Sequence, residues 1–182
     1  DADGRIRKEA GTFDFQGKKW YTDSNGIVKQ NSGLVDDGAT RYYATADGSI
    51  QTTAGFVTVG GKRYLVTNGG AVSKTSGTFK YGSSWYAAAS DGSIITTVGI
   101  TTSGGKYYYV TNTNGVLAVN KAVKAGKKTY HAASNGILAI GVHKYKKSYY
   151  YSDSKAVVRT KTGIVKWNGG YYHVKKGGKL TT

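Results

Sequence analysis

Residues 55–76 read GFVTVGGKRYLVTNGGAVSKTS, and this stretch decides the fold. A short run of β-branched and aromatic residues, 56–59, meets Gly60-Gly61, and a second run of the same kind, 62–67, follows. Two-residue turns rich in glycine are the favoured hairpin connection, because small residues accept positive φ there. Asn68-Gly69-Gly70 then supplies a second turn before an aliphatic residue. The stretch is therefore predicted to form a β-hairpin followed by a return turn.

The same pattern recurs along the whole chain, in four columns that keep one register. Successive members of the aromatic column are 22 residues apart, except for one step of 20. The aromatic column is Trp20, Tyr42, Tyr64, Tyr86, Tyr108, Tyr130, Tyr150 and Tyr172. Six residues after each aromatic lies the glycine column, which is Gly26, Gly48, Gly70, Gly92, Asn114, Gly136, Ala156 and Gly178. Two residues further lies the aliphatic column, which is Val28, Ile50, Val72, Ile94, Val116, Leu138, Val158 and Leu180. A glycine, or Lys121 in one case, precedes each aromatic by nine residues.

These columns define eight units, 11–32, 33–54, 55–76, 77–98, 99–120, 121–140, 141–162 and 163–182, with residues 1–10 as the tail of a preceding repeat. A lone hairpin buries too little to be stable, whereas stacked hairpins share a continuous core. The sequence therefore predicts an all-β fold, a β-solenoid of about eight stacked hairpin repeats of 20–22 residues in a single domain, 11–182. The aromatic and aliphatic columns are assigned to the core. Because no signal peptide is recognisable, the chain is expected to be cut from a longer precursor.

Charge is distributed unevenly along the chain. The 182 residues include 26 Lys and Arg against 10 Asp and Glu, a formal charge of +16. Residues 1–91 carry 11 basic and 9 acidic side chains, whereas residues 92–182 carry 15 basic and 1 acidic, Asp153. A surplus gathered in one half is typical of a surface that binds a polyanion.

The sequence contains no recognisable arrangement of catalytic residues. The absence of cysteine excludes disulfides, thiolate metal sites and a cysteine nucleophile. His131, His143 and His173 lie at different points of their units, without metal-ligand spacing. Adjacent Asp36 and Asp37 point to opposite faces of a strand, so they cannot form the pair that glycoside hydrolysis needs. The aspartates of the return turns, Asp23, Asp47, Asp91 and Asp153, are expected to bind their own backbone. We expect neither enzyme activity nor a cofactor nor a metal, and no apolar run is long enough for a membrane span.

A unit such as GTFDFQGKKWYTDSNGIVKQNS (11–32) resembles the hairpin repeats of Gram-positive surface proteins, the choline-binding and glucan-binding cell-wall repeats. The resemblance covers essentially the whole chain and depends on the Gly, G-K-x-Y-Y and D-x-x-G-x-hydrophobic pattern. It implies that the hairpins wind into a β-solenoid with ligands in grooves between successive hairpins.

Choline itself is not expected to bind. The family's cation cage needs a tryptophan directly after the repeat glycine, and this chain has other residues there, such as Leu34, Ile100 and Ile164. The second strand carries Lys19, Arg41 and Arg63 in early units. A quaternary ammonium needs aromatic faces around it, and these cations would repel it.

The Cys-free, Met-free, basic composition most resembles the wall-anchoring domain of S-layer proteins of lactic-acid bacteria. This resemblance implies a secreted protein of the bacterial cell surface, cell wall or S-layer that binds teichoic or lipoteichoic acid. The last three units supply the cations for such a polymer, because flexible lysines follow a polyphosphate without exact geometry. The predicted polyanion-binding residues are Lys121, Lys124, Lys127, Lys128, Lys144, Lys146, Lys147, Arg159, Lys161, Lys166, Lys175, Lys176 and Lys179.

Interleaved aromatics could stack on sugar or polyol C–H faces, or could serve packing between units. The predicted saccharide-stacking residues are Tyr107, Tyr109, Tyr145, Tyr149, Tyr151, Trp167 and Tyr171. The main alternative is a module of a wall hydrolase or glucan-binding protein that binds neutral glucan or another wall polysaccharide. Nucleic acid would use the same charge, but no nucleic-acid fold signature is present, so no specific nucleic acid is expected. Self-association in a lattice is a further possible role.

Overall fold

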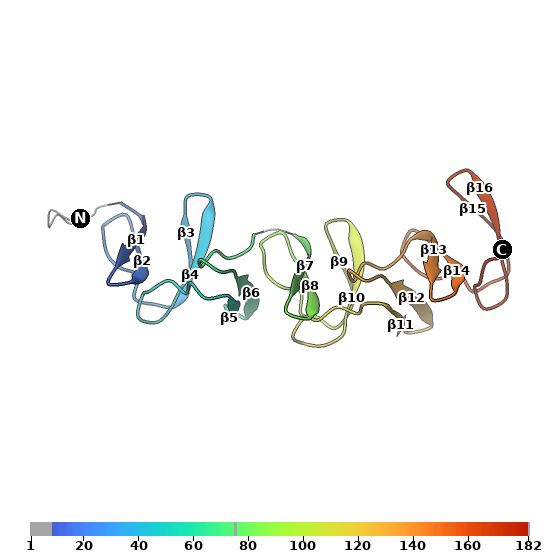
Figure 1. Ribbon diagram of the computed structural model, residues 1–182, viewed down its shortest axis with the longest axis horizontal. Helices are drawn as coiled ribbons and strands as arrows, with labels where there is room; N and C mark the ends of the chain where they lie inside the picture. Colours follow the sequence, from blue (N-terminus) through green and yellow to red (C-terminus); the bar gives the residue numbers. More distant parts are fainter. Residues whose placement is uncertain (1–8, 75, 182) are drawn as a thin grey trace. The chain divides into compact units, whose positions relative to one another are not determined.

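A computed structural model describes residues 9–74 and 76–181, and Figure 1 shows the strands that these residues form. Within these residues all regular structure is β, with sixteen strands of five residues each and no helix. The strands are β1 (Gly11–Phe15), β2 (Lys18–Thr22), β3 (Gly33–Asp37), β4 (Thr40–Ala44), β5 (Gly55–Val59), β6 (Lys62–Val66), β7 (Gly77–Tyr81), β8 (Ser84–Ala88), β9 (Gly99–Ser103), β10 (Lys106–Val110), β11 (Lys121–Ala125), β12 (Lys128–Ala132), β13 (Gly141–Tyr145), β14 (Ser148–Ser152), β15 (Gly163–Trp167) and β16 (Gly170–Val174). Each odd-numbered strand pairs antiparallel with the next strand, so the predicted eight hairpins are confirmed over the described ranges.

The predicted two-residue turns connect the strands of each hairpin. Gly60 and Gly61 have φ of 56° and 74°, the left-handed conformation that both central positions of such a turn require. The turn sets the register, in which Val57 lies opposite Tyr64. Lys146 takes the first turn position between β13 and β14 with φ of 53°, and its side chain is exposed there.

A side-chain carboxylate or amide holds six of the described return turns, those of Asp23, Asp47, Asp91, Asn112, Asn135 and Asp153. Oδ1 of Asp23 accepts hydrogen bonds from the backbone N–H groups of Asn25 and Ile27, each at 2.9 Å. Asp153 accepts from Lys155 and Val157 in the same way. The prediction that these aspartates bind their own backbone is therefore confirmed.

Successive hairpins are joined by one recurrent backbone hydrogen bond. The N–H of an aliphatic-column residue donates to a carbonyl on the second strand of the preceding hairpin. In one part of the chain Ile50 donates to Lys19 at 2.7 Å and Val72 donates to Arg41 at 2.7 Å. In another part Leu138 donates to Tyr107 at 2.8 Å. Each return segment therefore closes its own hairpin and also pairs with the one before it.

The two predicted core columns are buried in the middle hairpins and half-buried elsewhere. Tyr64, Tyr86, Tyr108 and Tyr130 of the aromatic column are at most 7% exposed. Trp20, Tyr42, Tyr150 and Tyr172 are half-buried. The aliphatic column is buried except at Val28 and Val116. The core assignment is thus confirmed for the inner hairpins.

One repeat, 99–120, departs from the predicted columns. The sequence places Asn114 in the glycine column and Val116 in the aliphatic column, and this assignment is wrong by one residue. Gly115 takes the left-handed conformation with φ of 81°, and Leu117 is buried while Val116 is half-buried. The physical reason is an extra residue in the return turn, because Thr111 N–H bonds to the carbonyl five residues ahead, whereas Asp23 N–H bonds to the carbonyl four ahead.

The described residues divide into two compact units. The first unit contains residues 9–74 and 90–94, and the second unit contains residues 76–89 and 95–181. That the hairpins form one domain over 11–182 stays a prediction. Each unit has its own clusters of buried side chains, such as Val57, Tyr64, Val66 and Val72 in the first.

Candidate functional site

Carboxylates pair with most of the described cations of the first unit. Five ion pairs join described residues, and all of them lie in that unit: Lys18–Asp47, Lys19–Asp14, Arg41–Asp36, Lys62–Asp91 and Lys74–Asp36. The hydrogen bonds from Arg41 and then from Lys74 hold the pKa of Asp36 below its usual value. The hydrogen bond from Lys62 does the same for the pKa of Asp91.

The second unit has sixteen basic residues and one acidic residue, Asp153. Between its described residues there is no ion pair, so its lysines face solvent without a carboxylate partner. Each of the predicted lysine ligands is exposed, and Arg159 is half-buried. The structure therefore leaves the second unit with an uncompensated positive field that favours anionic ligands.

Three of these lysines occupy equivalent positions on successive hairpins. Lys124, Lys144 and Lys166 each follow the inward-facing residue of a first strand, so they point to the opposite face. Lys144 lies directly opposite Tyr149, and Lys166 lies opposite Tyr171. The Lys166 ammonium is 5.6 Å from the centre of the Tyr171 ring, so a cation and an exposed ring form one surface there.

The other predicted cations lie at turns and at a strand end. Lys127, Lys128, Lys146 and Lys147 are at or beside hairpin turns, as predicted. Lys175, Lys176 and Lys179 belong to the return turn after β16, and Lys121 begins β11. These side chains do not converge on one hollow, so they offer a distributed charge rather than a shaped site.

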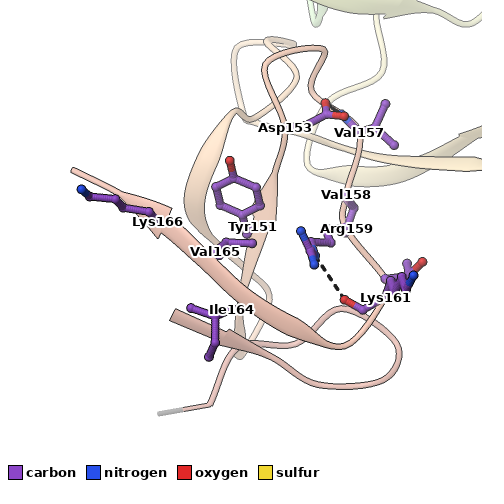
Figure 2. A pocket seen from close by; sticks show the side chains of 10 residues that line it. Tyr151, Asp153, Val157, Val158, Arg159, Lys161, Ile164, Val165 and Lys166 are labelled. Atoms are coloured by element: carbon purple, nitrogen blue, oxygen red, sulfur yellow. Dashed lines mark hydrogen bonds between the residues drawn. The ribbon is translucent and has the colours of Figure 1, made fainter. Parts of the chain in front are cut away.

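A hollow of about 690 Å³ lies between hairpin β13–β14 and hairpin β15–β16 (Figure 2). Tyr151 of β14 and Arg159 and Lys161 of the following return segment line it, together with Ile164 and Lys166 of β15. Figure 2 shows the Tyr151 ring between the Lys166 side chain and the Arg159 guanidinium. The structure thus brings cationic and aromatic predicted ligands together in a single site.

The predicted aromatics fall into two groups. Tyr107 and Tyr109 are half-buried and pack against the cluster around Tyr130. Trp167 lies edge-on to Tyr151 and against Gly141, where an added methyl group would overlap its ring. Tyr149 and Tyr171, in contrast, are 44% and 71% exposed. Tyr149 also lines a smaller, mostly apolar hollow of about 320 Å³ with Val142 and Tyr172. Exposure therefore favours Tyr149 and Tyr171 for contact with a ligand.

A ring cluster that was not predicted lies between β12 and β13–β14. His131 Nδ1 is 2.9 Å from His143 Nε2, and Tyr145 stacks on His131 with ring centres 4.1 Å apart. The Tyr145 hydroxyl also accepts a hydrogen bond from the Ala122 N–H. Burial lowers the pKa of His131 to about 4, and burial also lowers the pKa of His143. The 20-residue step in the aromatic column is the sequence signal that marks this junction.

The remaining chemistry is sparse over the part of the chain that the structure describes. No three His, Cys, Asp or Glu side chains gather as a metal site there. None of the elements in these ranges is a helix with the length and apolarity needed to cross a membrane. His173 Nδ1 lies 3.0 Å from Thr181 Oγ1, and this hydrogen bond involves neither of the other two histidines.

The comparison with known proteins gives matches in structure alone. No protein-family model and no curated protein sequence matches this chain. CbpJ from Streptococcus pneumoniae superposes with a TM-score of 0.68 at 24% identity, over 95% of this chain and 58% of CbpJ. Choline-binding protein F from the same species gives 0.60 at 24% identity, over 90% and 55%. The choline-binding domain of CbpL, also from S. pneumoniae, gives 0.60 at 22% identity, over 95% and 87%.

The fold is the β-hairpin solenoid of the choline-binding repeats. The predicted resemblance is therefore confirmed at the level of fold, and the resemblance to S-layer wall anchors stays a prediction. The chain spans 58% of the length of CbpJ and 55% of that of choline-binding protein F.

Proposed function

We propose that this chain is a non-catalytic wall-binding module that holds a secreted Gram-positive surface protein on teichoic or lipoteichoic acid. The observation that carries the proposal is the contrast between the two units. Four lysines of the first unit, Lys18, Lys19, Lys62 and Lys74, are paired with aspartates, whereas those of the second unit have no carboxylate partner among the described residues. Charge without an internal partner is available to an external polyanion.

The chemistry of the polymer suits this surface. Teichoic acid carries about one negative charge per polyol unit along a flexible chain. Lysine ammoniums are compact charges on flexible stems, so they can follow such a chain without a fixed geometry. Neutralising phosphates along a polyanion releases counterions, so binding should weaken steeply as salt rises.

The structural neighbours support wall binding as the general role. Choline-binding protein F was solved in the presence of a peptidoglycan analogue, and its fold covers 90% of this chain at a TM-score of 0.61. Another neighbour is the modular autolysin LytC of S. pneumoniae, with a TM-score of 0.51. We extend wall binding from those proteins to this chain, with anionic polymer rather than choline as the ligand.

The parent protein is proposed to be of the S-layer type, located at the cell surface. Self-association in a lattice is part of that proposal and depends on the composition alone. The module itself is proposed to lack enzyme activity, since the acid nearest the basic hollow, Asp153, is engaged by two backbone N–H groups.

The test is a pull-down of the full chain on purified Gram-positive walls, before and after extraction of teichoic acid. Binding should be lost after extraction, and it should fall steeply between 50 and 300 mM NaCl, by about a hundredfold or more. Unchanged binding to stripped peptidoglycan would refute the proposal. Binding that survives high salt would point to a neutral ligand instead.

A second candidate, a neutral glucan or other saccharide, is favoured by one observation. Tyr149 and Tyr171 are exposed, and Tyr149 borders the mostly apolar hollow with Val142 and Tyr172. Aromatic faces of this kind can stack on sugar C–H groups. Salt-tolerant binding to dextran or starch, lost on removal of these rings, would support this candidate.

A further inference from the structure

The hollow between β13–β14 and β15–β16 has three kinds of lining. Arg159, Lys161 and Lys166 supply positive charge, and Val157 and Ile164 supply apolar surface. The Tyr151 ring stands among them (Figure 2). The one acid in the lining is Asp153, whose Oδ1 already accepts two backbone hydrogen bonds. The balance inside the hollow is therefore positive.

Arg159 is the best positioned of the three cations. Its backbone N–H donates to the Tyr151 carbonyl at 2.9 Å, which fixes the chain beneath the hollow. Its Nε donates to the Lys161 carbonyl at 3.2 Å, and this bond orients the guanidinium plane (Figure 2). No described residue bonds to its Nη atoms. The two Nη groups thus remain as a planar donor pair, which matches two oxygens of a phosphate or carboxylate.

An equivalent hollow in the first unit gives an internal comparison. It has a volume of about 460 Å³ and is lined by Tyr21, Asp23, Val28, Lys29 and Asn31, among others. Each of these lies 130 residues before the corresponding lining residue of the second unit, so the repeat builds the same cavity twice. The ring is kept, since Tyr21 corresponds to Tyr151.

The two hollows differ in charge. Lys161 corresponds to Asn31 of the first hollow, and Lys166 corresponds to Asp36. Asp36 is in turn occupied by ion pairs with Arg41 and Lys74. The repeat therefore builds a hollow at the same place in both units, smaller and close to neutral in the first and larger and clearly positive in the second.

We propose that the hollow at Tyr151–Lys166 is a subsite for one phosphodiester group of a polyol phosphate. The Arg159 Nη pair binds the phosphate oxygens, while Lys161 and Lys166 neutralise this group and the next one along the polymer. Tyr151, Val157 and Ile164 contact the carbon chain on either side of the phosphate. A cavity of this volume is in the usual range for small-molecule sites and holds several polyol units. This proposal rests on the proposed function and specifies where along the basic hairpins the polymer is gripped.

The same charges exclude a quaternary ammonium. A trimethylammonium group needs surrounding aromatic faces, and here three cations share the lining with a single ring. Choline should therefore neither occupy the hollow nor compete with the phosphate.

The test is titration of the full chain with a glycerol phosphate trimer, followed by calorimetry or by NMR of the backbone amides. In the variant Arg159→Gln/Lys161→Gln/Lys166→Gln, affinity for the trimer should fall at least tenfold. The matched control Lys175→Gln/Lys176→Gln/Lys179→Gln removes the same charge from the last return turn and should lower affinity less than threefold. Arg159→Lys, which keeps the charge but loses the planar donor pair, should fall between the two. Equal losses in the two triple variants would overturn the subsite, because they would show that only net charge matters.

Two further measurements distinguish a failure of the subsite from misfolding of the variant and from a failure of the proposed function. If the triple variant misfolds by circular dichroism, the variant Lys166→Asp, which changes one exposed residue to its counterpart in the first unit, should still lower trimer affinity at least threefold. Choline chloride at about 10 mM, a concentration that would occupy even a site of millimolar dissociation constant, should not displace the trimer. Displacement would overturn the proposal. If the subsite variants bind the trimer normally while teichoic-acid extraction still abolishes wall binding, the subsite is wrong and the wall-binding function stands.

Discussion

Gly92 lies against the backbone carbonyl of Ser73, so closely that a methyl group on Gly92 would overlap the carbonyl oxygen. Gly92 also has a left-handed backbone, with φ of 81°. The same contact recurs two repeats earlier, where Gly48 lies against the carbonyl of Lys29. The glycine column is thus a packing column as well as a turn column, because the return segment of one hairpin rests on the return segment of the hairpin before it.

Replacing Gly92 by alanine should therefore destabilise the protein more than an ordinary turn glycine would. We expect a loss of about 3 kcal/mol or more in the free energy of unfolding, from backbone strain plus displacement of a carbonyl. Gly60→Ala is the matched control in the same unit, since Gly60 is also left-handed but has open space around it. It should cost about 1 kcal/mol. Urea denaturation followed by circular dichroism gives both values, and equal losses would show that the Ser73 contact is unimportant.

The hairpins could be predicted from sequence because their determinants are local. Most turns have a glycine or asparagine at a left-handed position, with Lys146 as an exception, and the alternation around Val57 and Tyr64 fixes which face is buried. Asn114 was misplaced because an inserted residue in a return turn leaves the period of the flanking columns unchanged. The turn needs a residue with a left-handed backbone at position 115, and Gly115 adopts it. Counting residues from the aromatic column does not reveal this requirement.

The site could be predicted only in part. Charge and exposure follow from composition, so the lysines were assigned to the surface correctly. The grouping of Tyr151, Arg159 and Lys166 depends on how a return segment lies across the next hairpin, and no sequence pattern gives that directly. The pairing of His131 with His143 depends on a shortened connection, with two residues between Leu138 and Gly141 in place of the four between Val28 and Gly33.

Unpaired lysines should matter more for polymer binding than paired ones. A variant of four second-unit lysines and a variant of four first-unit lysines lose the same charge. The first variant is Lys121, Lys124, Lys127 and Lys128 to Gln, and the second is Lys18, Lys19, Lys62 and Lys74 to Gln. Each phosphate contact contributes about 0.7 to the magnitude of the slope of log affinity against log salt. Loss of four contacts in the first variant should therefore make the slope shallower by about 3. It should change by less than about 1 in the second, because those ammoniums are held by aspartates and contact no polymer. Titration with purified lipoteichoic acid at several NaCl concentrations measures both slopes, and identical slopes would contradict the pairing argument.

The exposed rings should contribute to binding without contributing to stability. The double variant Tyr149→Ala/Tyr171→Ala should weaken binding to glycosylated wall polymer about fivefold, which corresponds to about 1 kcal/mol of lost stacking. Its unfolding midpoint should stay close to that of the natural chain, since Tyr171 is 71% and Tyr149 is 44% exposed and neither belongs to a core cluster of the described residues. Tyr107→Ala is the control, because that ring packs against the core and its loss should lower stability instead. Wall pull-down and thermal unfolding on the same samples separate the two effects, and unchanged binding in the double variant would remove these rings from the site.

The histidine pair should make folding sensitive to acid in a defined range. His143 Nδ1 lies 3.0 Å from the Gly141 carbonyl, which can only accept, so that nitrogen carries the proton. His143 Nε2 is then the acceptor, and His131 Nδ1 donates to it. Burial lowers the pKa of both rings, so any additional proton in the folded protein must enter buried surroundings.

The pKa of His131 is lowered to about 4 in the folded chain, against the ordinary value of 6.5 in the unfolded chain. Between these values the unfolded state binds more protons, so the free energy of unfolding falls as pH falls from 6.5 to 4, by about 3 kcal/mol for this group. His131→Phe keeps the ring contact with Tyr145 and should remove at least half of that slope. Urea denaturation at pH 7.0, 5.5 and 4.5 measures the slopes, and an equal pH dependence in His131→Phe and in the natural chain would show that the pair does not couple protonation to folding.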